Sequence, residues 1–416
     1  MAKIHYHSDL NYFGGSENMI SNFLNSKSLN ESFQISLSYR FTEDYDKELR
    51  RRLRGVTSLY PIKLPIFSIY KKNSVCTRSF LNKLSDYVIY LLEYVPKALL
   101  TLFLLHRLFR QIKPEILHVN NGGYPGALSC RIAVLAAKLA GIQNIVFVVN
   151  NKAVNYRNPY RWPDLFIDRL VARYTSFFIT GSPITMARLR TVLPILESKT
   201  ACFPNGINVR DTSETQAQTL TRLGLEGFNG IIFGVVGVME HRKGHLHLLK
   251  SIKILLDSKK LSTKSLVVLI EGSGGVRSSL EKFTRENDLA EVVRFIDVED
   301  QIFNFIAAID VLVFPAIQDE DFPNVISEAM ALSKPVIATK VAGAIEQVLH
   351  NQTGLLVDIF SEVQLASALE VLSKDRQKIR YMGELGRQRY VEFYTADKSV
   401  KNYERLYRNL LESFSD

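Results

Sequence analysis

Short apolar runs rich in Val, Ile and Leu alternate along the whole chain with longer stretches of helical periodicity. Runs of this kind are typical of parallel strands that are buried on both faces and connected by helices. The expected strands of the first half are Lys3–His7, Ile116–Val119, Ile145–Val149 and Phe177–Thr180. Those of the second half are Gly230–Val236, Leu266–Ile270, Val293–Ile296, Val311–Phe314, Val336–Ala338 and Leu355–Val357. The pattern predicts an α/β protein with two parallel sheets, each flanked by helices.

A turn-rich stretch, Phe203-Pro204-Asn205-Gly206-Ile207-Asn208, lies between the two series of strands and is suited to a hinge. A chain of 416 residues is also too long for one compact core. We therefore expect two Rossmann-like domains, one over residues 1–208 and one over residues 209–395. The final segment, residues 396–416, is expected to form a helix.

One hydrophobic segment, Tyr87–Phe109, is long enough to raise the question of a membrane span. It contains Glu93, Pro96, Lys97 and His106, which a spanning helix rarely tolerates together. We expect one or two helices here that are either buried or in contact with a membrane surface, and we favour burial. The N-terminus lacks the basic and apolar regions of a signal peptide, which favours a cytoplasmic protein.

Charge is distributed unevenly between the two halves. Residues 1–210 contain 28 Lys and Arg against 13 Asp and Glu, whereas residues 211–416 contain 24 against 29. A basic first half suits an anionic partner such as membrane lipid, a phosphorylated carrier or nucleic acid, although it is also compatible with a general solubility bias. No nucleic-acid-binding signature accompanies the charge, so we expect no nucleic-acid partner.

Candidate chemistry follows three strands of the second half, where ligands of open parallel sheets bind. In the first loop, the adjacent Arg242 and Lys243 at a helix start could neutralise a diphosphate. In the second loop, Gly272 and Gly274 would let the backbone approach a base or phosphate, although a plain tight turn explains them equally well. The third loop leads from Glu320 into a helix that carries Glu328, and both carboxylates could accept hydrogen bonds from sugar hydroxyls.

The segment Glu320-Asp321-Phe322-Pro323-Asn324-Val325-Ile326-Ser327-Glu328 resembles the signature of retaining glycosyltransferases of the GT-B fold, in the glycosyl transferases group 1 family. Other motifs match in order: Gly14-Gly15-Ser16-Glu17, the Phe203–Asn208 turn, Lys243-Gly244, Glu271–Gly274, Lys334–Ala338, Gly343 with Glu346, and Thr353–Val357. The resemblance covers essentially the whole chain and is most specific over residues 230–360. It implies two facing Rossmann-like domains with the active site in the cleft between them.

The resemblance also implies roles for individual residues. Lys243 would contact the donor diphosphate, and Glu328 would bind the ribose hydroxyls. Glu320 would hold the transferred sugar, and Gly272, Gly274, Phe322, Pro323 and Asn324 would contribute to donor binding. Gly15 would offer its backbone to the phosphate region or to the acceptor, and the C-terminal helix would pack back on the first domain. Members of the family transfer with retention of configuration and usually need no metal, so no cofactor is expected beyond the nucleotide-sugar co-substrate.

Two positions depart from the family pattern. Val238 stands where many members have an arginine, and Arg242 could supply that charge from the other side of the loop. Asn150 stands where many members have a histidine that contacts the sugar. We keep Asn150 as a candidate catalytic residue because an amide donates and accepts hydrogen bonds, but it cannot act as an acid or base.

Other readings remain open at this level. Asp319-Glu320-Asp321 contains an Asp-x-Asp pattern of metal-dependent transferases, and His241, His245 and His247 could in principle bind a metal, although we expect none. A dinucleotide oxidoreductase would use the Gly272 loop with Glu291, but Arg277 replaces the third glycine. The cysteines, Cys76, Cys130 and Cys202, lack ligand-like spacing. An epimerase of the same architecture or an inactive sugar-nucleotide-binding protein is also compatible with the motifs.

The expected reaction moves a sugar, from a UDP-sugar in our preferred reading, to a saccharide or polyprenyl-linked acceptor in bacterial-type surface polysaccharide synthesis. The basic first half, the cluster Arg50-Arg51-Arg52 with Arg54, and the apolar segment suggest an acceptor at the inner face of the cytoplasmic membrane. The sequence does not distinguish UDP from GDP.

Overall fold

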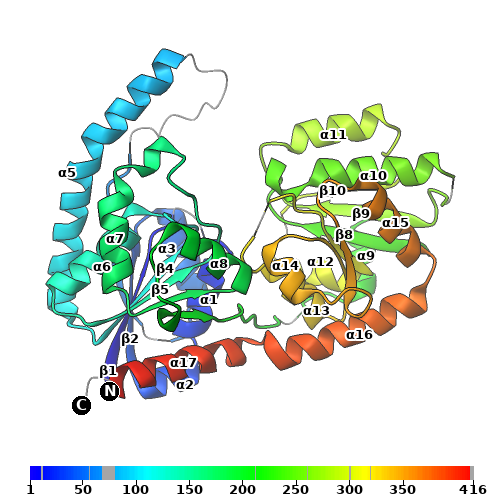
Figure 1. The fold of residues 1–416 in the computed structure, drawn as a ribbon. Helices are drawn as coiled ribbons and strands as arrows, with labels where there is room; N and C mark the ends of the chain where they lie inside the picture. Colours follow the sequence, from blue (N-terminus) through cyan, green and yellow to red (C-terminus); the bar gives the residue numbers. More distant parts are fainter. Residues whose placement is uncertain are drawn as a thin grey trace. The chain divides into compact units, whose positions relative to one another are not determined.

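The protein is described by a computed structural model that covers residues 1–10, 13–55, 57–67, 80–210, 212–259, 261–298, 301–318 and 320–412. It divides into two compact units, one formed by Met1–Pro204 with Asp397–Asp416 and one formed by Asn205–Ala396. Figure 1 shows a sheet flanked by helices in each unit. Every strand pair in both sheets is parallel, as the sequence pattern predicted.

The first unit is built on a sheet of seven strands in the order β3-β2-β1-β4-β5-β6-β7. Its strands are β1 Ala2–Ser8, β2 Phe33–Arg40, β3 Ser58–Ile62, β4 Ile116–Asn121, β5 Asn144–Val149, β6 Phe177–Thr180 and β7 Thr200–Cys202. Its helices are α1 Gly15–Leu24, α2 Lys27–Ser32, α3 Glu43–Arg52, α5 Phe80–Ile112, α6 Leu128–Leu139, α7 Asp164–Tyr174, α8 Pro183–Val192 and α17 Ala396–Glu412, with short 3-10 turns η1 Pro159–Arg161 and η2 Glu197–Lys199.

The second unit is built on six strands in the order β10-β9-β8-β11-β12-β13. These strands are β8 Ile231–Val236, β9 Leu266–Glu271, β10 Val293–Ile296, β11 Val311–Phe314, β12 Val336–Thr339 and β13 Gly354–Val357. The helices are α9 Gln216–Arg222, α10 His245–Asp257, α11 Arg277–Glu286, α12 Ile302–Ala308, α13 Asn324–Ala331, α14 Ala342–Gln347, α15 Glu362–Ser373 and α16 Arg376–Phe393, with the 3-10 turn η3 His241–Lys243.

The boundary between the units lies after Pro204, four residues before the predicted one. The reason is that residues of the predicted hinge form hydrogen bonds with the second unit. The side-chain amide of Asn205 donates to Phe322 O at 3.4 Å, and Ile207 N donates to Tyr394 O at 3.0 Å. Most of the predicted hinge is therefore fastened to the second unit.

The structure adds three strands that the apolar pattern did not reveal, β2, β3 and β7. β2 is an inner strand of the sheet but carries two buried serines, Ser36 and Ser38, which interrupt its apolar run. Their hydroxyls bond the buried rings of His5 and His7 on β1 at 2.8–2.9 Å. Burial lowers the pKa of His5 to about 3 and that of His7 to about 4, so both rings are neutral core groups at pH 7. β3 and β7 are short strands at the sheet edges, where burial is weak.

The final helix, α17, is packed on the first unit. Tyr407 is fully buried, and its hydroxyl bonds His118 Nδ1 at 2.6 Å and Tyr6 Oη at 3.1 Å. Tyr403 packs against Phe23 and Phe203 with ring centroids 4.8 and 5.0 Å apart. An aromatic, hydrogen-bonded contact joins the end of the chain to β1 and β4.

The expectation that the segment 87–109 is buried is wrong. It belongs to one helix, α5, which lies at the outside of the first unit beside α6 (Figure 1). Only 22% of its most apolar window is buried, although the helix is long and apolar enough to cross a membrane. One face, with Tyr90, Tyr94, Leu105 and Phe109, enters the core. The opposite face is equally apolar but has no protein partner among the described residues, so hydropathy alone overstated its burial.

Candidate functional site

The loop after β8 carries Arg242 and Lys243 and ends at Gly244, which precedes α10. Gly244 has a left-handed backbone, with φ 72°, and a Cβ at this position would lie 1.8 Å from Pro315 O. Ile317 N donates to Arg242 O at 2.9 Å, which binds the loop to the segment after β11. Only glycine permits this approach, and it brings the two basic residues close to the Glu320 loop.

The loop after β9 contains the predicted glycines Gly272 and Gly274. A Cβ on Gly272 would lie 2.2 Å from Gly237 O, and one on Gly274 would lie 2.3 Å from Met239 O. Both have positive φ, and Met239 N donates to Ser273 O at 2.8 Å. These glycines therefore serve a close contact between two backbone loops at the carboxyl edge of the sheet, a reason that the sequence could not reveal.

The third loop places Glu320 ahead of α13, in the order the motif predicted. Gly343 N donates to Glu320 O at 3.0 Å, and a Cβ on Gly343 would lie 1.9 Å from Asp321 O. The side chain of Gln347, which is fully buried, donates to Pro323 O at 3.0 Å. Phe322 is buried against Tyr394, and Asn324 opens the helix. The segment from Glu320 to Pro323 is thus bonded to α14.

Arg242, Lys243 and Glu320 form one charged cluster. Lys243 Nζ lies 2.7 Å from Glu320 Oε1, and Arg242 Nη1 bonds the same carboxylate oxygen. Arg242 Nε also bonds Glu240 at 2.7 Å. The side chains of Lys243 and Glu320 are only 17% and 15% exposed, so their charges interact in a partly desolvated environment. Because both cations pair with one carboxylate, an anionic ligand could also form ion pairs with them at this site.

Glu328 projects from α13 at a half-buried position and has a perturbed pKa. Burial raises the pKa of Glu328 to about 7, Arg210 opposes the rise, and the carboxylate of Glu271 adds to it. Glu271 is the buried last residue of β9. Sequence reasoning gave no role to Arg210 or Glu271 as charged neighbours of Glu328, because no local motif joins residues so far apart in the chain.

Gly15 lies in the first unit, at the start of α1 and at the carboxyl edge of the sheet. Glu17, two residues later in α1, is fully buried and accepts a hydrogen bond from the Ser8 hydroxyl on β1 at 2.6 Å. Tyr45 Oη donates to the same carboxylate at 3.3 Å. Burial raises the pKa of Glu17 to about 7, against the opposing effect of these hydroxyl hydrogen bonds. Glu17 therefore has a structural function in the glycine loop, which the motif match alone did not indicate.

Asn150 follows β5 at the same edge of that sheet. Its side-chain amide donates to Asn120 Oδ1 at 2.9 Å and to Asn121 O at 2.8 Å, and its backbone N–H donates to Gly122 O at 2.8 Å. The strand order places β4 between β1 and β5, so Gly15 and Asn150 follow strands that are not neighbours. These bonds fasten the ends of β4 and β5 together, and a catalytic role for Asn150 stays a prediction.

Comparison with known proteins gives this geometry a context. The family model described as glycosyl transferases group 1 matches residues 226–389, which include all three loops. Residues 226–389 belong to that family. The chain is 32% identical over 185 residues to the capsular polysaccharide biosynthesis glycosyltransferase CapM of Staphylococcus aureus, covering 44% of this chain and 47% of that one. It is 27% identical over 241 residues to the O-antigen chain mannosyltransferase C of Escherichia coli, covering 57% of this chain and 62% of that one.

In these alignments the chain spans roughly half the length of the curated relatives it matches. Structural similarity extends further. Anabaena Alr3699/HepE, solved in complex with UDP, matches 98% of this chain and 100% of its own with a TM-score of 0.76 at 15% identity. WaaG, a glycosyltransferase involved in lipopolysaccharide biosynthesis, matches 96% of this chain with a TM-score of 0.63 at 13% identity. The predicted GT-B fold of two Rossmann-like domains is confirmed.

The alternative sites that the sequence suggested find less support in the structure. Among the described residues, no three His, Cys, Asp or Glu side chains stand close enough to hold a metal ion. Asp319, part of the Asp-x-Asp pattern, and Cys76 lie outside the described residues. Arg50 bonds Asp46 at 2.8 Å, and Arg51 and Arg52 bond Glu48 at 2.8 and 2.5 Å, so the predicted basic cluster on α3 is largely paired within its own helix.

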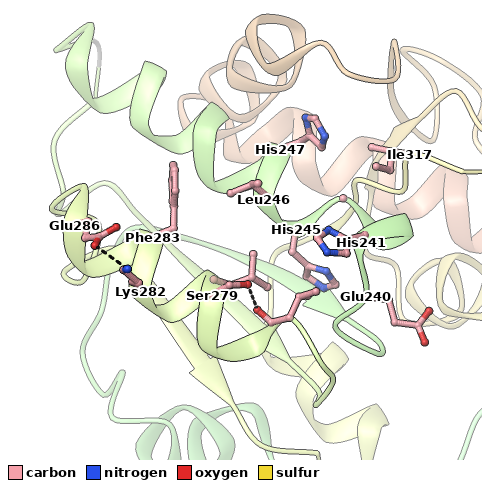
Figure 2. A pocket seen from close by; sticks show the side chains of 13 residues that line it. Glu240, His241, His245, Leu246, His247, Ser279, Lys282, Phe283, Glu286 and Ile317 are labelled. Atoms are coloured by element: carbon pink, nitrogen blue, oxygen red, sulfur yellow. Dashed lines mark hydrogen bonds and ion pairs between the residues drawn. The ribbon is translucent and has the colours of Figure 1, made fainter. Parts of the chain in front are cut away.

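A cavity of about 360 Å³ lies between the start of α10 and α11 (Figure 2). Its lining includes His241, His245 and His247, which the sequence analysis considered as metal ligands. His247 bonds Glu362 at 2.8 Å, and His245 is buried with a pKa lowered to about 4, mainly by burial. The cavity borders the loop of Arg242 and Lys243, and most of its other walls are apolar.

Proposed function

We propose that this protein is a retaining glycosyltransferase that transfers a sugar from a nucleotide-sugar donor, a UDP-sugar, to a saccharide or lipid-linked saccharide acceptor. The observation that carries the proposal is the cluster of Arg242 and Lys243 on Glu320, eight residues before Glu328. The relatives named for capsule, O-antigen and lipopolysaccharide synthesis support a place in cell-surface polysaccharide assembly. The neighbour solved with UDP supports the choice of carrier.

In the proposed donor complex, the diphosphate lies against Lys243 and Arg242 and replaces part of their interaction with Glu320. Glu328, whose pKa is raised to about 7, accepts hydrogen bonds from the ribose hydroxyls when ionised. Glu320 turns toward the hydroxyls of the transferred sugar. Each charged group thereby exchanges one partner for another, which limits the cost of desolvation on binding.

The reaction proceeds on one face of the sugar. The bond between the anomeric carbon and the diphosphate oxygen breaks, and its electron pair stays on the diphosphate. The acceptor oxygen attacks from the side of departure, and its proton passes to the departing oxygen. Lys243 and Arg242 stabilise the developing negative charge, which carries most of the rate. In this scheme Glu320 positions the sugar and forms no covalent bond with it. No cofactor or metal enters this scheme.

The acceptor is proposed to lie on the first unit, near the Gly15 loop and Asn150, with the enzyme in the cytoplasm and peripheral on the inner face of the cytoplasmic membrane. The basic balance of residues 1–210 supports this placement.

The test is formation of a glycosidic bond from UDP-sugars and GDP-sugars with polyprenyl-linked saccharides as acceptors, with the anomeric configuration of the product read by NMR. We expect product with the donor's configuration, no covalent adduct, and loss of product in Lys243→Ala. A changed sugar without an acceptor would indicate an epimerase. Nucleotide binding without either product would indicate an inactive binding protein, and a glycosyl ester trapped on Glu320 would contradict the front-face scheme.

A further inference from the structure

The outward face of α5 is a continuous apolar stripe. Its exposed members recur at helical spacing over about four turns, which corresponds to roughly 24 Å of helix. They are Val88 at 47%, Leu92 at 71%, Val95 at 60%, Leu99 at 59% and Phe103 at 61% exposure. Exposed apolar residues on a folded protein are usually scattered, so a stripe of this length indicates a surface that meets something other than water.

The sides of the stripe are also apolar. Ile89, Leu91 and Leu100 are each between 38% and 50% exposed. Between Val88 and Phe103 the helix carries one carboxylate, Glu93, and Lys97 Nζ bonds it at 2.5 Å. The stripe therefore presents no unpaired acid to a partner.

Cations follow the stripe directly. Arg107, Arg110 and Lys113 are exposed on the last turns of α5 and just beyond them. None of the three makes an ion pair with any residue that the structure describes. An apolar face that ends in unpaired cations matches a bilayer with anionic headgroups, where acyl chains and negative charge lie a few ångströms apart.

A second group of exposed apolar residues lies beside the N-terminal half of α5. The Tyr160 ring packs against Tyr87 and Tyr90 at 5.2 and 5.4 Å between centroids, which places η1 next to that half of the helix. Two residues later, Trp162 is 60% exposed, and Phe166 on α7 is 69% exposed. Trp162 donates its indole N–H to Tyr156 O at 3.1 Å, so its polar edge is bonded while the ring is exposed, as in interfacial tryptophans.

We propose that the stripe on α5, with Trp162 and Phe166, docks the first unit on an anionic lipid bilayer, with the helix lying in the interface rather than crossing it. Crossing is excluded while the other face of α5 stays in the core through Tyr90, Tyr94, Leu105 and Phe109. A second copy of the chain is a poorer partner for this surface. Its stripe would offer Arg107, Arg110 and Lys113 one carboxylate, Glu93, which Lys97 already bonds. The inference rests on the membrane association proposed above and names the surface responsible for it.

The test uses the full chain in flotation with phosphatidylcholine vesicles, with and without phosphatidylglycerol. The wild type is expected to float with anionic vesicles, and Leu92→Glu/Phe103→Glu to lose at least tenfold in bound fraction. Leu196→Glu, a matched change at a residue 66% exposed between α8 and β7, is expected to bind as the wild type does. Arg107→Glu/Arg110→Glu is expected to lose binding to anionic vesicles with a weaker dependence on salt.

Trp162 is the one tryptophan of the chain and supplies a second readout that needs no variant. Its emission is expected to shift to the blue on anionic vesicles and to be quenched by brominated lipids. Absence of vesicle binding, or binding unaffected by the stripe variant, would overturn the proposal. So would a concentration-dependent dimer that the stripe variant abolishes, because a second copy would then cover the stripe.

A thermal shift with UDP or GDP in the same samples separates the two proposals. If the wild type is stabilised by nucleotide but does not float, the proposed donor site stands and the proposed docking surface is wrong. If it floats but is stabilised by no nucleotide, the proposed docking surface stands and the proposed function is wrong.

Discussion

Replacing Glu320 by glutamine is expected to strengthen the binding of a free nucleoside diphosphate. Glu320 bonds both Arg242 and Lys243, with Lys243 Nζ 2.7 Å from its carboxylate, so an incoming diphosphate meets a negative charge within about 6 Å. At an effective dielectric constant near 20, two unit charges at that distance repel by about 3 kcal/mol. The side chains are 15–35% exposed, which reduces the effect to about 1–2 kcal/mol, or roughly 5- to 30-fold in affinity.

Isothermal titration calorimetry with UDP and GDP measures this directly. Glu240→Gln is the matched control, because Glu240 also bonds Arg242 at 2.7 Å but is 48% exposed, and we expect its effect to stay below about threefold. The gain in Glu320→Gln should shrink as salt is raised. Sugar transfer should nevertheless be lost in this variant, since the group proposed to position the sugar is gone. Unchanged or weaker diphosphate binding in Glu320→Gln would refute the placement of the diphosphate against Lys243.

Three further predictions concern stability and are measured by urea unfolding. The first concerns Glu17, whose pKa burial raises from 4.5 in the unfolded chain to about 7, so the free energy of unfolding of the wild type falls as pH rises through that window. Between pH 4.5 and pH 7.5, Glu17→Gln should therefore gain about 3 kcal/mol in unfolding free energy relative to the wild type. A difference that is independent of pH would contradict the burial argument. Gly244→Ala should lose about 2–4 kcal/mol, since its Cβ would lie 1.8 Å from Pro315 O at φ 72°, and a neutral effect would show that the loop adapts. Arg131→Met should lose about 3 kcal/mol of unfolding free energy, because Arg131 is 3% exposed and pairs with the buried Asp164 and Asp168. Arg161 pairs with the same two aspartates, so a loss below about 1 kcal/mol would show that Arg161 compensates.

The strands of the second unit were predictable because each is a short apolar run that ends in a turn. β2 was not predictable, since Ser36 and Ser38 make it polar in sequence, and the rings of His5 and His7 that satisfy those serines lie on another strand. The exposure of α5 was likewise hidden, because hydropathy records that a side chain is apolar and not whether the fold supplies a partner for it.

The candidate site was also predictable in part, where its residues share one local motif. Motif spacing along one loop and helix placed Glu320 before α13 and Glu328 within it. The meeting of Glu320 with Arg242 and Lys243 requires two loops from β8 and β11, which are neighbours only in the sheet. The influence of Arg210 and Glu271 on Glu328 depends on burial and distance through space, and neither has a local signature in the sequence.

The donor site is tested by a thermal-shift screen of the wild type and Glu328→Ala against UDP, GDP, ADP and CMP and their sugar conjugates, with and without EDTA. A ligand that binds only the folded state raises the melting temperature by mass action. We expect stabilisation by the UDP series, unaffected by EDTA and lost in Glu328→Ala. Stabilisation by none of these nucleotides, or stabilisation that Glu328→Ala leaves intact, would contradict the proposed donor site.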